Sequence, residues 1–304
     1  MEKPKIILAG GSGFLGRTLA PELLSRGYDV VILTRDDNSD LAAARAVPWD
    51  GATSGAWTAE LEGTKAVIGL AGKNVNCRYT VRALREINES RIRSTRALGD
   101  AIHRCSVPPL VWVQASSLAI YGDAGEVECT EDTPVGQGIP VETCLAWERA
   151  FAESPTPRTR RVLLRISFVL RRKEGALRLM EKITRCGLGG TIASGRQYVS
   201  WIHWHDMNRI FVRAIEDASF EGSFNATSPG PVPNADFMRE LRRVLHRPWS
   251  PPLPSWLLPL GCWLLRTEPV LARTGRRGVP TRLLDHGFSF AFADLPAALR
   301  DIFP

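Results

Sequence analysis

The stretch that decides the fold is Lys5-Ile6-Ile7-Leu8-Ala9-Gly10-Gly11-Ser12-Gly13-Phe14-Leu15-Gly16. Its first five residues form a short apolar run with β-branched side chains, which predicts a buried strand. Gly10, Gly13 and Gly16 follow at intervals of three residues, and the leucine-rich segment from Leu15 to Arg26 then predicts a helix. The chain therefore opens with a strand, a tight glycine turn and a helix.

The three glycines have different physical roles in such a turn. The first allows the sharp change of direction, the second lets the backbone approach a bound group, and the third lets the helix pack closely on the strand. The first amides of the helix have no partner within it and lie at the positive end of its dipole, so they can bind a diphosphate. The residues that we predict to bind the diphosphate of a dinucleotide are Gly10, Ser12, Gly13, Phe14, Leu15 and Gly16.

Further short apolar runs alternate with helical patterns, which predicts an α/β fold with a doubly wound, mostly parallel Rossmann sheet. The amphipathic segments Arg82–Arg104 and Val141–Ala152 are predicted helices. The predicted strands are Lys5–Ala9, Val30–Thr34, Ala46–Trp49, Ala66–Leu70, Leu110–Ala115, Val162–Ile166 and Gly222–Asn225.

After Leu170 the alternation weakens and loops rich in glycine and proline become frequent. We therefore predict a Rossmann domain over residues 1–172 and 203–228, with a smaller interleaved C-terminal substrate lobe over residues 173–202 and 229–304. The longest apolar stretch, Leu253–Leu265, is interrupted by prolines and is too short to cross a bilayer. It predicts a buried helix pair in the lobe.

Composition narrows the function classes. The net charge is +7, but the basic runs lack the patterns of helix-turn-helix, zinc-finger or RNA-binding motifs, so we expect no nucleic-acid partner. The six cysteines have no C-x-x-C pair, which predicts reduced thiols and no metal site. The N-terminal residues lack the pattern of a signal peptide. We expect a cytoplasmic protein with a small-molecule substrate and no membrane partner, and a homodimer is compatible with the sequence.

The end of the second predicted strand indicates which dinucleotide is bound. Thr34-Arg35 stands about 20 residues beyond the glycine turn, where an Asp or Glu would bind the ribose of NAD. An arginine pairs instead with a 2′-phosphate, which favours NADP(H). The alternative is a surface arginine at this position, with Asp36 or Asp37 making the ribose contact.

With these residues placed, the sequence resembles the extended short-chain dehydrogenase/reductases, and more narrowly an atypical branch of the NAD-dependent epimerase/dehydratase-like proteins with a small C-terminal domain. The resemblance covers nearly the whole chain. The segments that carry it are Leu70-Ala71-Gly72, the Glu86 to Thr95 segment, Ser116 to Gly122, Arg165 to Leu170, Gly187 to Gln197, Ser200 to His203, and Gly287 to Leu299.

The resemblance implies further contacts with the cofactor. Thr34 and Arg35 would hold the 2′-phosphate end of the adenosine, and Val169 would lie near the nicotinamide unless it is a core residue. Arg91 would reach the cofactor from its helix, or alternatively pair with Glu86 or Glu89. The other residues that the resemblance implies at the cofactor are Leu70, Ala71, Gly72, Glu86, Ser116 and Arg165.

Enzymes of this kind use a tyrosine four residues before a lysine, which lowers the pKa of the phenol, and a serine that polarises the substrate oxygen. Ser117 fits the serine role, with Ser116 as the second choice. The predicted helix Val141–Ala152 contains neither tyrosine nor lysine, and Cys144 and Glu148 take those two positions. A carboxylate there raises rather than lowers the pKa of a neighbouring thiol, so the usual proton relay cannot operate.

Two hypotheses follow from these residues. The first is an NADP(H)-dependent oxidoreductase or epimerase-like enzyme, in which Ser117 orients the substrate and Cys144, Glu148 or Tyr121 handles the proton. Tyr198, His203 and His205 are further titratable groups for which a structural role is the simpler interpretation. The second hypothesis is an NADPH-binding regulator or scaffold without turnover, which the missing tyrosine and lysine favour.

Overall fold

Seven parallel strands form the central sheet of the computed structural model, which describes residues 3–35, 43–247, 249–264 and 266–304. From one edge to the other they are β11 (Gly222–Ala226), β7 (Arg160–Ile166), β5 (Val111–Ser117), β4 (Ala66–Gly69), β1 (Lys5–Ala9), β2 (Asp29–Thr34) and β3 (Arg45–Pro48). All seven predicted strands are confirmed, with ends that differ by at most two residues. The chain leaves β1 toward β2 on one side and later returns to β4 on the other, so the strand order reverses at β1. In sheets of this kind the ligand crevice lies outside the carboxyl ends of the strands at that point.

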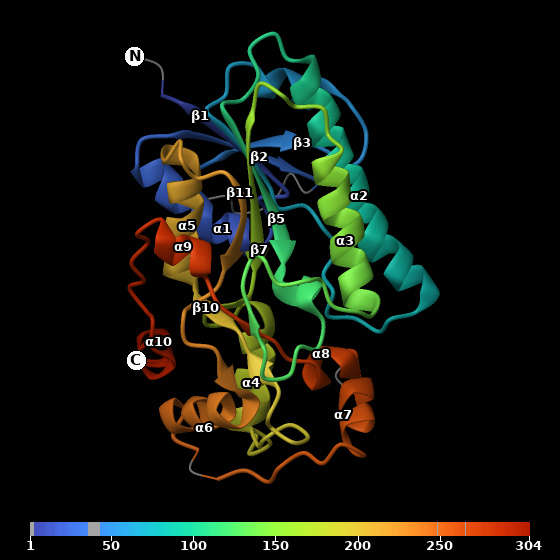
Figure 1. Ribbon diagram of the computed structural model, residues 1–304, viewed down its shortest axis with the longest axis vertical. Coiled ribbons are helices and arrows are strands. Elements are labelled where there is room, and N and C mark those ends of the chain that lie inside the picture. Colours follow the sequence, from blue (N-terminus) through green and yellow to red (C-terminus); the bar gives the residue numbers. More distant parts are fainter. Residues whose placement is uncertain (1–2, 36–42, 248, 265) are drawn as a thin grey trace.

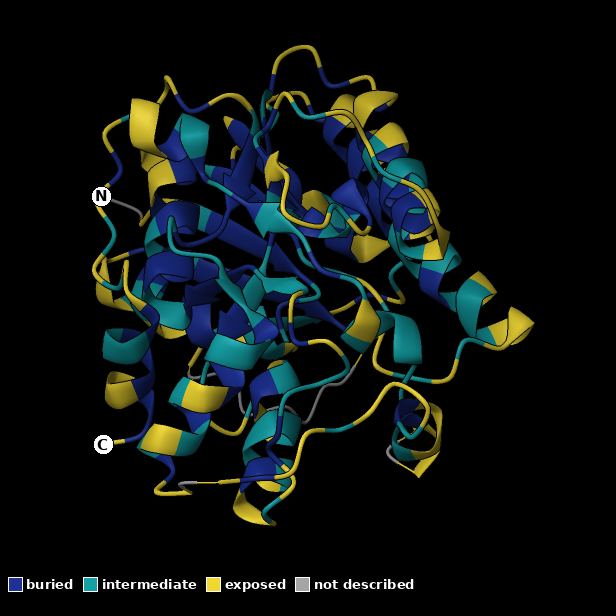
Figure 2. Cartoon of the chain, turned by 60° about the horizontal axis from the view of Figure 1, so that its bottom comes forward, coloured by how far each residue is buried: buried dark blue, intermediate teal, exposed yellow. Residues whose placement is uncertain are grey.

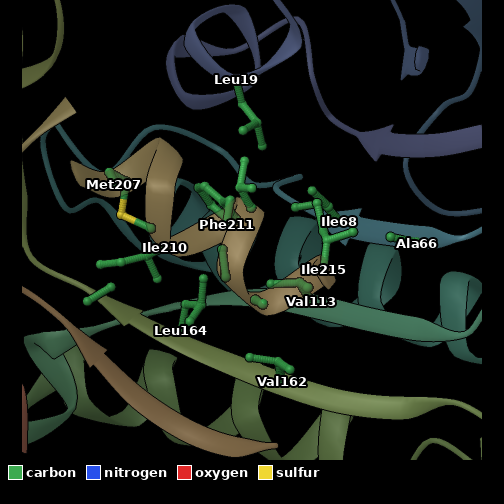
Figure 3. Packing of buried hydrophobic residues seen from close by; sticks show 14 of the residues in the cluster. Leu19, Ala66, Ile68, Val113, Val162, Leu164, Met207, Ile210, Phe211 and Ile215 are labelled. Atoms are coloured by element: carbon green, nitrogen blue, oxygen red, sulfur yellow. The ribbon is translucent and has the colours of Figure 1, made fainter. Parts of the chain in front are cut away.

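Helices cover both faces of the sheet (Figure 1). On one face lie α1 (Phe14–Ser25) and α5 (Trp204–Glu216), and on the other lie α2 (Val81–Arg104) and α3 (Ile139–Ala152). Figure 3 shows Leu19 of α1 and Phe211 of α5 pointing at Ile68 of β4, and all three side chains are fully buried. Each buried aliphatic or aromatic side chain of this size stabilises the fold by about 1.5–3 kcal/mol. The doubly wound Rossmann fold predicted from the alternating pattern is confirmed.

Three arginines at the start of β7 bind the carboxyl ends of three different helices. Arg158 donates to the carbonyl oxygen of Cys105, the C-cap of α2, at 2.6 Å. Arg160 donates to the carbonyl oxygen of Ala214 in the last turn of α5 at 2.9 Å, and Arg161 donates to the carbonyl oxygen of Phe151 at the end of α3. The last carbonyls of a helix lack partners and carry negative potential, which a guanidinium neutralises. This part of the positive charge therefore has a structural role.

The remaining elements pack beyond the carboxyl edge of the sheet (Figure 1). A separate apolar cluster joins α4 (Gly175–Arg185), α6 (Asn234–Val244) and α10 (Leu295–Ile302). Short strand pairs link this region, namely β8 (Phe168–Leu170) with β10 (Trp201–His203), β9 (Tyr198–Val199) with β12 (Val232–Pro233), and β6 (Glu128–Cys129) with β13 (Arg277–Gly278). The short helices are η1 (Ala56–Leu61), η2 (Leu118–Tyr121), α7 (Leu258–Leu264), α8 (Pro269–Arg273) and α9 (Thr281–Asp285). Leu283 of α9 and the nearby Phe288 pack in the core of the central sheet, although the predicted division assigns them to the lobe.

The prediction of a buried helix pair over Leu253–Leu265 is wrong for the outer side of α7. Leu258 and Cys262 face inward and are buried, but four other apolar side chains are exposed; Figure 2 colours the described residues by burial. These four are Trp256, Leu260, Trp263 and Leu264. A helix of seven residues at the edge of the molecule has a neighbour on one side only, so it buries one side only. Within the described residues, every helix is too short or too polar to traverse a lipid bilayer.

The glycine turn gives the first prediction. A Cβ atom placed at Gly16 would lie 2.1 Å from the carbonyl oxygen of Gly11. This oxygen belongs to the backbone, so it cannot rotate away as a flexible side chain could. We expect Gly16→Ala to lower the free energy of unfolding by about 2 kcal/mol or more, because α1 must move away from β1. Urea denaturation followed by circular dichroism measures the change.

Gly261→Ala is the matched control. Gly261 lies inside α7, and no atom lies within 4 Å of the position that its Cβ would take. Alanine is favoured over glycine inside a helix by about 1 kcal/mol, so this variant should be as stable as the wild type or slightly more so. Equal destabilisation by both substitutions would show that close packing at Gly16 is not the cause.

Candidate functional site

The glycine turn is held in place by a backbone hydrogen bond to β2 and by another within the turn itself. The amide of Gly10 donates to the carbonyl oxygen of Leu33 in β2 at 2.9 Å, and the amide of Gly13 donates to the carbonyl oxygen of Gly10 at 3.2 Å. Gly10 has a φ of +80°, which a side chain would disfavour, and a Cβ there would lie 2.7 Å from Cα of Ala71. The segment after β4, which begins Leu70-Ala71-Gly72, therefore packs directly on the turn.

The amides that follow the turn are open. In the part of the chain that the structure describes, the N–H groups of Phe14, Leu15 and Gly16 have no hydrogen-bond acceptor. Gly13 is the N-cap of α1, and a Cβ at this position would meet no atom closer than 3.5 Å, so the backbone is not crowded at the start of the helix. Unpartnered amides at the positive end of a helix dipole fit the diphosphate of a dinucleotide. The residues present therefore fit the predicted cofactor.

The end of β2 lies beside the turn. The buried hydroxyl of Thr34 donates to Oγ of Ser12 at 2.9 Å, which connects the second strand to the loop. Arg35 follows it with an exposed side chain, at the carboxyl edge of the sheet. Asp36 and Asp37, the alternative ribose contacts, lie outside the described residues.

A buried polar network replaces the missing tyrosine and lysine. Glu148 on α3 accepts two hydrogen bonds from Arg165 on β7, one to each carboxylate oxygen, at 3.1 and 3.0 Å. Ser116 donates to Glu148 at 2.7 Å. Arg165 also donates to the hydroxyl of Tyr121 at 2.9 Å, and Tyr121 in turn donates to Oδ1 of Asn225 at 2.8 Å. The network connects β5, β7 and β11 to α3.

The network occupies groups that the sequence suggested for cofactor binding or catalysis. The side chains of Arg165 and Glu148 are only 12% and 14% exposed, and each is the other's ion-pair partner. The hydroxyl of Tyr121 both donates and accepts, and burial raises the pKa of Tyr121. In this arrangement Glu148 and Tyr121 hold neighbouring elements together, and each of their side-chain oxygens has a hydrogen-bond partner.

Cys144 lies one helical turn before Glu148 and is buried. Burial raises the pKa of its thiol to about 12, and the negative charge of Glu148 contributes in the same direction, while the nearby Arg91 and Arg276 oppose it. The thiol is therefore protonated at neutral pH, which makes it a poor nucleophile. Ser117, in contrast, accepts a hydrogen bond from the amide of Ala119 at 3.2 Å, and its hydroxyl hydrogen has no acceptor among the described residues.

The other residues implied by the resemblance are dispersed. Glu86 lies on the exposed side of α2, where Lys73 and Arg82 lower the pKa of its carboxyl to about 2. Arg91 donates to the carbonyl oxygen of Lys73 at 3.0 Å and lies 5.0 Å from the centre of the Trp147 ring, so it holds the segment after β4 rather than pairing with an acid. Val169 is buried in the apolar core.

The remaining titratable groups named from the sequence take structural positions. Burial lowers the pKa of His203 to about 4, although Asp301 of α10 lies 3.2 Å from its Nε2 atom. His203 is therefore neutral at pH 7 and accepts a hydrogen bond from the amide of His205. Tyr198 lies in β9, with the guanidinium carbon of Arg277 5.6 Å from the centre of its ring. Among the described residues, no three His, Cys, Asp or Glu side chains lie together as a metal site would require.

A cavity of about 320 Å³ opens beside η2, which directly follows Ser117 at the end of β5. Its polar lining residues are Tyr79, Asp123, Gln137, Glu268, Thr274 and Arg276, and the first residues of α3, Ile139 and Pro140, contribute apolar surface. Both carboxylates accept hydrogen bonds from backbone amides, Asp123 from Gly275 and Glu268 from Tyr79. A cavity of this volume fits a small ligand.

Two cavity groups were missed by sequence reasoning. Arg276 donates to the hydroxyl of Thr274 at 3.3 Å, and in the described residues it has no carboxylate at ion-pair distance, so burial lowers the pKa of its guanidinium. Tyr79 lies among polar residues after β4, and burial raises the pKa of its phenol to about 12. Its position beyond the carboxyl end of a strand was the one available signal, because ligands bind at that edge of such sheets.

Comparison with known proteins agrees with this geometry. Residues 6–153 match the NAD dependent epimerase/dehydratase family, and residues 253–302 match a domain of unknown function, DUF1731. The chain is 32% identical over 302 residues to the epimerase family protein SDR39U1 of Bos taurus, covering 98% of this chain and 99% of that protein. It is 33% identical over 301 residues to the epimerase family protein YfhF of Bacillus subtilis, covering 98% and 97%.

A solved structure extends the similarity to three dimensions. The crystal structure of human epimerase family protein SDR39U1 (isoform 2) with NADPH superposes with a TM-score of 0.87 at 30% identity, covering 98% of each chain. The similarity includes the central sheet, the glycine turn and the C-terminal region, since it spans both chains almost completely. The chain therefore belongs to the epimerase family, as a full-length relative of the SDR39U1-type proteins.

Proposed function

We propose that this protein binds NADP(H) and acts as an oxidoreductase or epimerase-like enzyme on a small polar substrate. The observation that carries the proposal is the set of open amides at the start of α1 beside the exposed Arg35. The amides suit a diphosphate, and a guanidinium at the end of β2 suits the 2′-phosphate that distinguishes NADP(H) from NAD(H). The crystal structure of the similar human protein with NADPH supports the same choice.

The cavity beside η2 is the proposed substrate site, and Ser117 is the residue that directly precedes η2. It adjoins the carboxyl edge of the sheet, where the nicotinamide of a dinucleotide on the glycine turn would lie. The unpaired guanidinium of Arg276 and the amide of Gln137 can bind polar oxygens of a substrate. When bound, the dinucleotide would supply hydride-transfer chemistry at this site.

Ser117 and Tyr79 are the hydroxyl groups that we assign to the reacting oxygen. The hydroxyl hydrogen of Ser117 is free among the described residues, so it can donate to a substrate carbonyl. Tyr79 lines the cavity, and its pKa of about 12 is below that of an ordinary alcohol, so transfer of its proton to a newly formed alkoxide is favourable. Cys144 has a similarly raised pKa and remains the alternative proton donor.

Glu148 is assigned a positioning role in this proposal. Its two carboxylate oxygens bind Arg165 and Ser116, so it fixes the end of β5 on which Ser117 stands. The alternative function is an NADPH-binding regulator or scaffold without turnover. The network of Glu148, Arg165 and Ser116 favours this alternative, because Glu148 stands where the lysine of the usual proton relay would be.

The role of Glu148 can be tested by stability. Glu148→Ala leaves the buried guanidinium of Arg165 without a counter-charge, and we expect the free energy of unfolding to fall by about 3 kcal/mol. Replacing both partners with Glu148→Leu and Arg165→Met should recover part of this loss, since no buried charge is left unpaired. Chemical denaturation measures both variants.

Glu89→Ala provides the control for Glu148→Ala. Glu89 also pairs with an arginine, Arg85, but on the solvent side of α2. An exposed pair of this kind stabilises by less than about 1 kcal/mol, so its removal should have little effect. A similarly small effect of Glu148→Ala would contradict the positioning role.

The cofactor assignment predicts a selective loss of affinity. Arg35→Asp should weaken NADPH binding by at least about tenfold, because the substitution replaces a charge-assisted contact with repulsion of the 2′-phosphate. NADH binding should change little. Titration calorimetry measures both affinities, and Arg247→Asp, the same charge change on another exposed loop, controls for the net charge of the protein. Equal losses for the two dinucleotides at Arg35→Asp would refute the 2′-phosphate contact.

Turnover is measured as NADPH oxidation with a panel of carbonyl compounds, and as chromatographic detection of epimerised product with a panel of sugar nucleotides, because epimerisation consumes no cofactor. We expect Ser117→Ala and Tyr79→Phe each to lower kcat by about 10²-fold or more with NADPH affinity unchanged, as expected for groups that act on the reacting oxygen. Cys144→Ala should retain activity if Tyr79 donates the proton, and loss of activity in this variant would transfer the role to the thiol. Tight NADPH binding without consumption of any panel member would favour the scaffold function instead.

A further inference from the structure

The outward side of α7 carries an apolar surface that the fold does not use. Its four residues, which we call the α7 patch, are Trp256, Leu260, Trp263 and Leu264, and they are 78%, 60%, 61% and 73% exposed. They recur at intervals of four, three and one residues, which is the spacing of one side of an amphipathic helix. Helical turns begin before α7, at Pro254, because the carbonyl oxygen of Pro254 accepts hydrogen bonds from the amides of Leu257 and Leu258.

The orientation of α7 is the opposite of that expected for a helix packed on a core. Its inner side contributes two buried side chains, Leu258 and Cys262, which is fewer than the four apolar side chains that its outer side exposes. Burial of a Trp or Leu side chain stabilises by about 1.5–3 kcal/mol, so leaving four of them exposed gives up that gain. Contiguous exposed apolar side chains of this size mark an interaction surface.

Arginines surround the α7 patch. Arg78 donates to the carbonyl oxygen of Trp263 at 2.9 Å, and its guanidinium carbon lies 5.4 Å from the centre of that ring. Arg273 donates to the carbonyl oxygen of Ser255 at 2.9 Å, next to Trp256. Arg266 follows the end of the helix and is exposed. Arg78, Arg266 and Arg273 are thus the basic residues beside the patch.

We propose that the α7 patch docks on the surface of an anionic lipid bilayer. Tryptophan and leucine side chains insert at the level of the lipid headgroups, and arginines beside them pair with lipid phosphates. The combination of exposed tryptophans and a basic rim matches such a surface in both polarity and charge. The inference is independent of the proposed enzyme function, because it uses no residue of the cofactor turn or the cavity.

The charge distribution argues against a second copy of the chain as the occupant. In a symmetric dimer the same patch faces itself, so Arg266 and Arg273 would meet their own copies around a helix of only seven residues. Like charges at the rim of so small an apolar contact are unfavourable. The expectation of no membrane partner rests on the apolar stretch Leu253–Leu265, which is too short to span a bilayer. That length requirement does not apply to a helix that lies on the membrane surface.

Vesicle co-sedimentation tests the proposal with the full-length protein. Wild-type protein should bind vesicles of equal parts phosphatidylcholine and phosphatidylglycerol, and bind vesicles of phosphatidylcholine alone much more weakly. The double variant Trp256→Ser with Leu260→Ser should lose binding to the anionic vesicles by at least about tenfold. Arg266→Gln should lower it by about fivefold, the contribution of one arginine near an anionic surface.

Leu110→Ser is the matched control, because Leu110 is 68% exposed but lies before β5, away from α7. It should bind vesicles as the wild type does, and all variants should give the circular dichroism spectrum of the wild type, which shows that they are folded. Absence of wild-type binding to anionic vesicles, or equal binding by the Trp256→Ser, Leu260→Ser variant, overturns the proposal. Sedimentation showing a wild-type dimer that this variant dissociates would assign the patch to a second copy.

Discussion

The close approach of α1 to the end of β1 is the constraint on which the site depends. A Cβ atom at Gly16 would overlap the carbonyl oxygen of Gly11, and one at Gly10 would overlap the backbone of Ala71. Without side chains at these positions, the helix, the first strand and the segment after β4 meet at one point. The amides of Phe14, Leu15 and Gly16 are consequently presented together at the carboxyl edge of the sheet, beside Arg35.

The ion pair of Glu148 and Arg165 shows how the same fold departs from the usual chemistry of its superfamily. A lysine at position 148 would leave a cation beside the substrate, whereas the carboxylate requires a cation of its own and obtains it from β7. The pair is buried, so both charges need their hydrogen bonds, and Ser116 and Tyr121 supply the additional ones. The hydroxyl groups of Ser116 and Tyr121 are therefore engaged in the network. The hydroxyl groups that we propose for the reaction are instead those of Ser117 and Tyr79.

The excess of positive charge serves several physically separate purposes. Arg158, Arg160 and Arg161 neutralise the carboxyl ends of three helices. Arg276 faces the cavity without a carboxylate partner among the described residues. Other arginines surround the exposed apolar side of α7. A net charge summed over the whole chain could not separate these roles, because each is defined by what the guanidinium contacts.

The sequence by itself determined the order and type of the main elements and the location of the glycine turn. These depend on local signals, namely the periodicity of apolar residues, the spacing of Gly10, Gly13 and Gly16, and the missing tyrosine and lysine near Cys144 and Glu148. Only the tertiary structure decided that Glu148 pairs with Arg165, that Tyr79 and Arg276 line one cavity, and that α7 leaves most of its large apolar side chains exposed. Tyr79 and Glu268, for example, are in contact across 189 positions of sequence. Partners and exposure at such positions are set by which elements pack together, and no local pattern contains that information.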